Sequence, residues 1–263
     1  MAQNELTEYD KVIQELFFRK YAEAADPQVP ELPFTTDEII SVANELGIAI
    51  KNIPDITYTY RSRRELPEKI LAICNWIIQP KGKSRFAFVR TTRSPFIEIQ
   101  EGLAPVEILN SLPEIVEKYT VYDEQGTLSA IRYNRLVDIF TEITCFHLQS
   151  HVRTTIDGEG QIEIDDIYVG VDQEGNEYVL PFEAKSPDER DKLGWVQVAN
   201  MVKYAKQNYP TLTCRPICAK PVDKNTIVLI EFQPIGDYEE IGITNIKLYK
   251  LVRPRKETQS QLA

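Results

Sequence analysis

Four charged residues lie in two neighbouring segments that are otherwise mostly apolar. Asp165 and Asp166 fall within an Ile- and Val-rich segment, and Glu183 and Lys185 end the next apolar segment. The two segments alternate as strands do, and they span 161–171 and 178–185. Turn-forming residues separate them, so the pattern predicts a β-hairpin. Residues two apart on a strand share a face, which places Glu183 beside Lys185.

This set of side chains indicates chemistry with a hard cation. Two carboxylates without His or Cys form an all-oxygen site suited to Mg²⁺, with Mn²⁺ as a substitute. Such an ion can polarise a phosphoryl oxygen and stabilise a leaving oxyanion. A neighbouring lysine can position or help deprotonate a water, or neutralise charge in the transition state.

Only one of the two adjacent aspartates can face Glu183 and Lys185, because neighbouring strand residues point to opposite faces. We favour Asp165, which shares a face with Glu163. Asp166 shares its face with Ile162, Ile164 and Tyr168, which are typical packing residues. A bulge at the Asp-Asp step would reverse the choice and make Asp166 the ligand.

The pattern resembles the PD-(D/E)XK nuclease superfamily, which has the restriction-endonuclease-like fold. Its signature is an acidic residue on one strand and Glu/Asp-X-Lys on the next, here Asp165 and Glu183-Ala184-Lys185. No proline precedes the aspartate here, and many members of the superfamily also lack it. The resemblance implies that Asp165, Glu183, Lys185 and Gln197 are catalytic. It also implies that Asp165 and Glu183 are metal ligands, and that Glu142 on the preceding helix is an additional one.

The resemblance covers about residues 130–222 and implies an α/β fold with a mixed sheet and an αβββαβ core. The chain has a matching order of predicted elements. They are a helix over 133–149, strands over 152–156, 161–171 and 178–185, a helix over 193–208 and a strand over 213–222. Two further strands are predicted over 226–233 and 244–252.

The first half of the chain predicts a mostly helical region that carries a β-hairpin. The predicted helices span 5–25, 36–47, 66–78 and 105–119, and the hairpin strands span 85–91 and 96–100. Residues 54–64 have an extended or looped pattern. We therefore divide the chain into a region over 1–120, a nuclease core over 121–255 and a polar tail over 256–263.

A basic block lies inside this acidic chain. Residues 51–93 hold ten basic and three acidic side chains, whereas the whole chain has a net charge of −10. Such a block is a candidate contact for DNA phosphates. Its densest clusters are Arg61, Arg63, Arg64, Lys81, Lys83 and Arg85. A winged-helix-like DNA reader over 36–100 is a weaker alternative, because the helix predicted over 66–78 is too apolar to lie in a groove.

A zinc site is a less favoured alternative. His147 and His151 are four residues apart near Cys145, and Cys214 and Cys218 are also four apart. Two cysteines at this spacing on a strand do not form the tight knuckle of a structural zinc site. We interpret the cysteines as buried thiols and the histidines as residues of a helix surface.

Composition excludes several classes of protein. With 43% hydrophobic residues, 13 Tyr and 10 Phe, the chain can form a core and is not disordered throughout. Four Cys are too few for a disulfide scaffold. The first residues lack the basic and apolar regions of a secretory signal, and no apolar stretch is long enough to span a membrane. We expect a cytoplasmic protein with free thiols.

The sequence thus predicts a Mg²⁺-dependent endonuclease that cuts double-stranded DNA, most similar to type II restriction enzymes and expected to be a homodimer. One alternative is a nuclease of the same fold that acts in repair, junction resolution or defence without a fixed recognition sequence. The other is a nucleic-acid-binding protein that kept the fold without catalysis.

Overall fold

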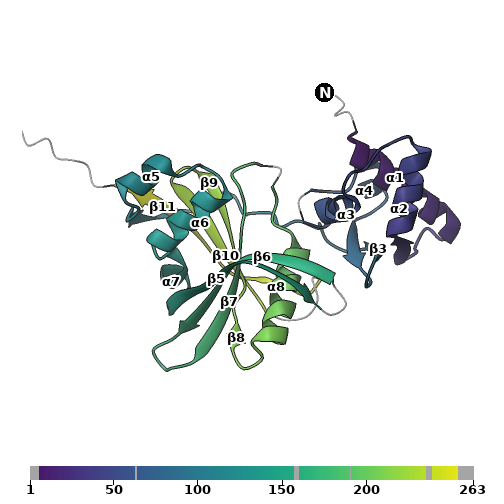
Figure 1. The fold of residues 1–263 in the computed structure, drawn as a ribbon. Helices are drawn as coiled ribbons and strands as arrows, with labels where there is room; N and C mark the ends of the chain where they lie inside the picture. Colours follow the sequence, from purple (N-terminus) through teal and green to yellow (C-terminus); the bar gives the residue numbers. More distant parts are fainter. Residues whose placement is uncertain (1–5, 63, 157–159, 190, 235–238, 254–263) are drawn as a thin grey trace, which may run out of the picture.

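The chain folds into two parts, each built around its own β-sheet. The computed structural model describes residues 6–62, 64–156, 160–189, 191–234 and 239–253. Figure 1 shows the smaller N-terminal part at one end and the larger part, built on a curled sheet, at the other. None of the helices within these ranges is long and apolar enough to cross a membrane.

The N-terminal part packs four helices on a three-stranded antiparallel sheet. Its elements are α1 (Glu8–Ala24), β1 (Glu31–Thr35), α2 (Thr36–Glu45), α3 (Ile53–Ser62), α4 (Glu68–Leu71), β2 (Trp76–Pro80) and β3 (Arg85–Arg90), with strand order β1-β3-β2. Thr7 and Thr35 begin α1 and α2 with capping boxes. Aromatic packing centred on Phe17, Trp76 and Phe88 forms the core.

The larger part is an eight-stranded mixed sheet with helices on both faces. Its elements are β4 (Pro105–Leu109), α5 (Glu114–Tyr119), α6 (Glu124–Tyr133), α7 (Leu136–Thr141), β5 (Thr144–Ile156), β6 (Gly160–Val171), β7 (Glu177–Ala184), α8 (Trp195–Asn208), β8 (Thr213–Cys214), β9 (Ile217–Asp223), β10 (Thr226–Phe232) and β11 (Ile243–Val252). The main strand order is β4-β11-β10-β9-β7-β6-β5, and β8 pairs with β7. One face packs on α8 and the other on α6 and α7. The predicted mixed α/β class is therefore confirmed.

Several predicted elements are wrong in type. The helix predicted over 133–149 is the end of α6, then α7, then the first half of β5. A break in the β5–β6 register between His147 and Gln149 interrupts the two-residue alternation, which hid the strand in the sequence. The apolar segment 66–78 forms only α4 and the start of β2, because burial in the small sheet outweighs its helical pattern.

Other segments of the N-terminal half also differ from prediction. Residues 54–64, expected to be extended or looped, contain most of α3. The expected hairpin is absent from this described stretch, because β3 pairs with β1 and β2 while Phe96 makes only an isolated bridge to Gly194. The helix expected over 105–119 is β4 followed by α5.

The two sheets divide before residue 120. β4 pairs in parallel with β11, so it belongs to the large sheet, and the division falls between β3 and β4. The polar tail expected over 256–263 lies outside the described residues.

Direct contacts hold the two parts together. Ile77 of the small sheet is buried in the core that packs on α8. The Arg93 guanidinium lies 3.5 Å from the Trp195 ring centroid and donates to the Ile241 carbonyl oxygen at 2.9 Å. These contacts place the N-terminal part beside α8, close to the predicted site.

Candidate active site

The predicted site lies at a fork in the large sheet. Pairing of β6 with β7 ends at Asp166–Phe182, and beyond this point β7 continues beside β9 while β6 continues beside β5. Ala184, past the fork, donates its backbone N–H to Asp165 Oδ2 at 2.7 Å. The aspartate thus accepts a backbone hydrogen bond on the side of β7 where pairing with β6 has ended.

Glu183 lies opposite Asp165 across the fork. Its neighbours Phe182 and Ala184 pack on the α6–α7 side of the sheet, so Glu183 points to the α8 side. The Lys185 ammonium donates to Glu183 Oε1 at 2.9 Å and lies 3.7 Å from Asp191 Oδ1. All of Asp165, Glu183 and Lys185 are buried, with at most 8% of their surface exposed.

Gln197, on the first turn of α8, orients Glu183. Its amide nitrogen donates to Glu183 Oε1, and its amide oxygen accepts the Gly194 backbone N–H at 3.2 Å. One side chain therefore caps α8 and holds the glutamate. The structure thus brings Gln197 into contact with Glu183.

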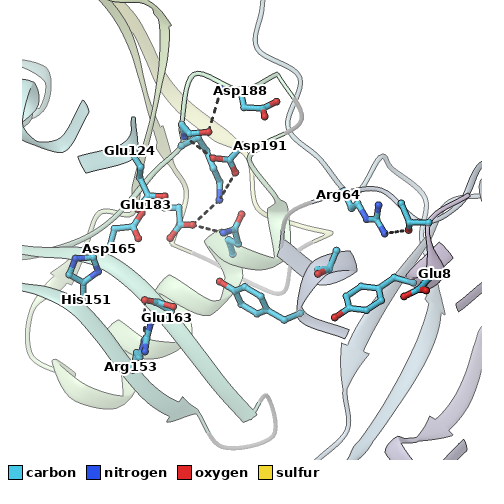
Figure 2. A pocket seen from close by; sticks show the side chains of 17 residues that line it. Glu8, Arg64, Glu124, His151, Arg153, Glu163, Asp165, Glu183, Asp188 and Asp191 are labelled. Atoms are coloured by element: carbon cyan, nitrogen blue, oxygen red, sulfur yellow. Dashed lines mark hydrogen bonds and ion pairs between the residues drawn. The ribbon is translucent and has the colours of Figure 1, made fainter. Parts of the chain in front are cut away.

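These residues line a cavity of about 930 Å³ between the two parts of the molecule, named here the carboxylate cavity. In Figure 2, Glu8 and Arg64 of the N-terminal part lie on the opposite side of this cavity from Asp165 and Glu183. Its described lining includes seven carboxylates, and its Lys and Arg residues are Arg64, Arg153 and Lys185. The excess of carboxylates favours a cation in the cavity.

Burial among like charges changes how these groups titrate. Burial, then repulsion from Glu183 and Glu124, raises the pKa of Asp165 to about 9. Burial also raises the pKa of Glu183, and Lys185 opposes that effect. The pKa of Lys185 is raised as well, because attraction to Glu183 and Asp191 exceeds the opposing effect of burial. Lys185 therefore remains an ammonium at neutral pH.

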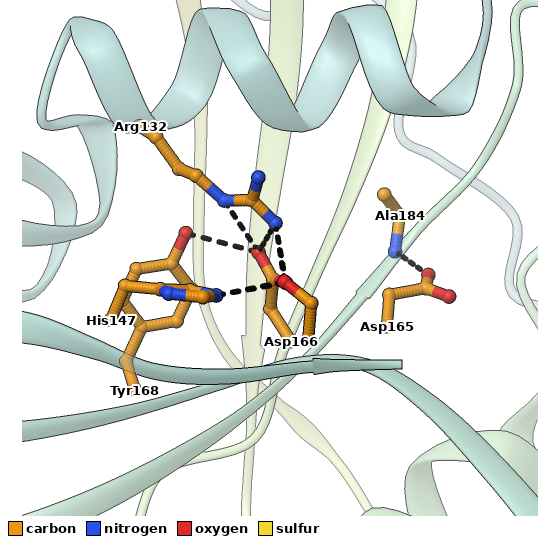
Figure 3. A network of polar contacts seen from close by, with 7 residues as sticks. Arg132, His147, Asp165, Asp166, Tyr168 and Ala184 are labelled. Atoms are coloured by element: carbon orange, nitrogen blue, oxygen red, sulfur yellow. Dashed lines mark hydrogen bonds and ion pairs between the residues drawn. The ribbon is translucent and has the colours of Figure 1, made fainter. Parts of the chain in front are cut away.

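Asp166 points to the other face of the sheet and is fully buried. Figure 3 shows Asp166 surrounded by Arg132, His147 and Tyr168, whereas Asp165 lies apart from them beside Ala184. Arg132 of α6 donates to Asp166 Oδ2 from Nη2 at 2.6 Å and from Nε at 3.0 Å. Ser150 and Tyr168 donate to it as well, and His147 Nε2 lies 3.1 Å from Oδ1. These partners leave the Asp166 carboxylate little capacity to bind a ligand.

Glu142 is not near the predicted metal site. It follows α7 in a left-handed conformation, its side chain is 82% exposed, and its ion-pair partner is Lys247 at 3.7 Å. Because the predicted long helix does not form, Glu142 does not face the carboxylates. Glu124, at the start of α6, lines the carboxylate cavity instead. Asp123 was a usable signal for this helix start, since its side chain accepts the Gly126 N–H as an N-cap.

Sequence reasoning also missed His151 and Asp191, which line the same cavity. His151 has φ of 50°, a left-handed conformation within β5 that no sequence pattern signals. Asp191 comes after the Glu-X-Lys motif in sequence, and only the tertiary structure brings it to the cavity.

The predicted basic residues do not form one surface. Arg64 lines the carboxylate cavity and also pairs with Asp10 at 3.2 Å. Arg61 and Lys83 line a second cavity, Lys81 pairs with Glu31, and Arg85 is exposed. Arg63 lies outside the described residues.

The residues considered for zinc are dispersed. His147 and His151 are on β5 rather than on a helix, and only His147 contacts Asp166. Cys145 packs on the α6–α7 side of the sheet, whereas Cys214 and Cys218 pack on the α8 side. More generally, in the part of the chain that the structure describes, no group of three or more His, Cys, Asp and Glu side chains is arranged to hold a metal ion.

Comparison with known proteins finds no matching family, no matching curated protein and no matching solved structure.

Proposed function

We propose that this protein is a metal-dependent endonuclease that hydrolyses phosphodiester bonds of DNA at Asp165, Glu183 and Lys185. The observation that carries the proposal is the meeting of these three side chains, with Gln197, at the fork between β6 and β7 beside a large cavity. Charged groups are costly to bury, so a cluster of them beside a cavity indicates function rather than packing.

The order of elements around the site supports the same proposal. Helices α6 and α7 are followed by β5, β6, β7, α8, the two-residue β8 and β9, which is an αβββαβ succession apart from the short β8. β5 pairs with β6 and β6 pairs with β7 in antiparallel fashion, whereas β9 is parallel to β7. This arrangement is compatible with a restriction-endonuclease-like core, which is the more specific fold that we propose.

The donor set fits a divalent cation such as Mg²⁺, with Mn²⁺ as a substitute. Mg²⁺ is commonly held by one or two carboxylates together with waters and substrate phosphates, so Asp165 and Glu183 suffice as protein ligands. Burial raises the pKa of both carboxyl groups, so ionising them in the fold is costly, and a bound cation would offset that cost. When bound, the cation supplies Lewis-acid polarisation of the phosphoryl group.

Lys185 acts as a cation rather than as a base. Its ammonium is held by Glu183 and Asp191 and keeps its proton at neutral pH. It can donate a hydrogen bond to the attacking water or to a phosphate oxygen, where it stabilises the charge that develops in the transition state. Gln197 is a positioning residue that holds Glu183 in place.

Double-stranded DNA as the substrate and a homodimer as the active form also belong to this proposal, as does a cytoplasmic location. The substrate and the dimer follow from the family resemblance, and the location follows from the sequence. A type II restriction enzyme is the form of the activity that the resemblance favours.

Incubation of supercoiled plasmid with the protein tests the activity. We expect cutting with Mg²⁺ or Mn²⁺ and none with chelator. Glu183→Gln and Lys185→Met should each lower the rate at least about a hundredfold, because both groups act in the transition state. Glu177→Gln, an exposed change on the same strand, is the control and should keep the wild-type rate.

Uncut plasmid under all metal conditions contradicts the activity, and wild-type cutting by Lys185→Met contradicts the site. The bands produced separate the possible forms of the enzyme. Discrete fragments indicate a fixed recognition sequence, whereas preference for single-stranded or branched DNA over duplex indicates a repair, junction or defence nuclease.

A further inference from the structure

A second cavity of about 930 Å³ adjoins the carboxylate cavity. It lies between α3, the turn that precedes β3 and the paired ends of β5 and β6. Tyr58, Arg153 and Glu163 line both cavities, so the two share a wall. Glu163 precedes Asp165 by two residues on β6, about 7 Å along the strand. The distance from the proposed cleavage site to the start of the second cavity is thus about the length of one extended nucleotide.

The inner wall of this cavity is apolar. Ile156 and Ile162 are buried beneath it, and the partly exposed Phe86 ring forms another side. The Phe86 ring stacks on Phe34 with centroids 5.7 Å apart and an interplanar angle of 23°. This stacking holds the Phe86 ring at the cavity as a fixed flat surface.

Positive charges surround the apolar wall. Lys83 is exposed and makes no ion pair within the described part of the chain, and Arg61 lies on α3. Arg153 is 69% exposed and contacts Glu163 at 3.1 Å, at the wall shared with the carboxylate cavity. Asp55, the other acidic residue of the lining, accepts the Tyr9 hydroxyl at 3.0 Å.

We infer that the second cavity binds an unpaired nucleotide of the DNA substrate next to the phosphate that is cleaved, with its base on the Phe86 wall and its phosphates at Lys83 and Arg153. Duplex DNA presents phosphates outward and keeps its bases stacked, so it cannot fill an apolar cavity. Unpaired bases stack on aromatic and apolar walls within positively charged grooves. This inference rests on the proposed nuclease function and specifies its substrate as duplex DNA that also carries a single-stranded segment.

Binding of labelled DNA by the full chain in Ca²⁺ tests the inference. The probes are a blunt duplex, the same duplex with a single-stranded overhang, and the overhang strand alone. We expect the overhang to raise affinity at least about fivefold, the range of one stacked base. Lys83→Gln with Arg153→Gln should abolish this gain and reduce the slope of log affinity against log salt by about 1.4, or 0.7 for each phosphate contact.

The matched control is Lys224→Gln with Lys250→Gln, which removes two positive charges from exposed positions outside both cavities. It should retain the gain from the overhang. Circular dichroism of both double variants verifies that the fold is intact.

The results separate this inference from the proposed function. Equal affinity for blunt and overhanging duplex, or an overhang gain that survives in the Lys83 and Arg153 variant, overturns the inference even if plasmid is cut. An overhang gain that depends on Lys83 and Arg153 supports the cavity as a nucleotide site even if no DNA is cut, in which case only the nuclease proposal fails.

Discussion

Asp165 and Asp166 are adjacent on β6 and nearly equally buried, yet they have opposite surroundings. Asp166 has Arg132, Ser150 and Tyr168 as hydrogen-bond donors and His147 in contact. Asp165 accepts one backbone N–H, lies near other carboxylates and borders a large cavity. The Asp166 carboxylate is compensated by Arg132, whereas Lys185, the cation that opposes the raised pKa of Asp165, is paired with Glu183 and Asp191.

The difference shows that burial of an acidic residue does not by itself identify a functional site. A buried carboxylate with a full set of partners ties elements together, here α6 to β5 and β6. A buried carboxylate among like charges at a cavity is costly to the folded state, and such a cost is typical of a site that binds a cation. The following experiments test this contrast.

The largest expected effect is on cleavage. Asp165→Asn should lower Mg²⁺-dependent plasmid cutting at least about a hundredfold, because it removes a proposed ligand and its charge. Asp166→Asn should keep most of the activity at a temperature where the variant remains folded. The reverse order of the two rates in a nicking assay moves the metal site to the Asp166 face.

The free energy of unfolding, unlike cleavage, should depend on the partners of Asp166. Arg132→Met leaves the Asp166 carboxylate buried without its main counter-charge, and we expect a loss of about 3 kcal/mol in the free energy of unfolding. Arg135→Met is the control, because Arg135 is 58% exposed and pairs with Asp138 on the surface, where loss of a pair costs less than about 1 kcal/mol. Urea unfolding measures both, and similar losses for the two variants contradict the assigned role of Asp166.

The pH dependence of stability should reveal Asp165. Its pKa is about 9 in the folded protein and about 3.9 when unfolded, so without metal the folded state keeps a proton that the unfolded state releases. This carboxyl group therefore stabilises the fold fully below about pH 4, and its contribution is lost as pH rises towards about 9.

An asparagine side chain cannot ionise, so the Asp165→Asn variant should become more stable relative to wild type as pH increases over this interval. Thermal unfolding in chelator at several pH values measures the difference. A constant difference between the two proteins would show that Asp165 is ionised in the fold and already compensated.

The smallest expected effect is on the Mg²⁺ requirement, and it should distinguish Glu124 from Glu142. Glu124 lines the carboxylate cavity, and burial followed by repulsion from Glu183 raises its pKa. Glu124→Gln should increase the Mg²⁺ concentration needed for half-maximal cutting by about fivefold, since it weakens attraction for the cation. Glu142→Gln should have no effect, and a metal requirement that changes only in Glu142→Gln restores the sequence-based assignment.

The local pattern of the chain determined several features by itself. Period-two alternation over 161–171 and 178–185 predicted β6 and β7, and helical periodicity over 193–208 predicted α8. The same alternation placed Glu183 beside Lys185 and favoured Asp165 over Asp166, and in the structure Lys185 contacts Glu183 while Asp165 contacts Ala184, the residue after Glu183. These features were predictable because they depend only on neighbours in sequence and on the period of a strand or helix.

Only the tertiary structure decided the rest. Pairing with β6 made a strand of a segment whose alternation is interrupted after His147, which removed Glu142 from the site and left Glu124 in its place. The fork between β6 and β7 opened the carboxylate cavity, and the packing of Ile77 beside α8 placed Arg64 along it and Lys83 along the second cavity. Contacts between residues far apart in the chain depend on how whole elements bury their surfaces against one another, and no local pattern contains that information.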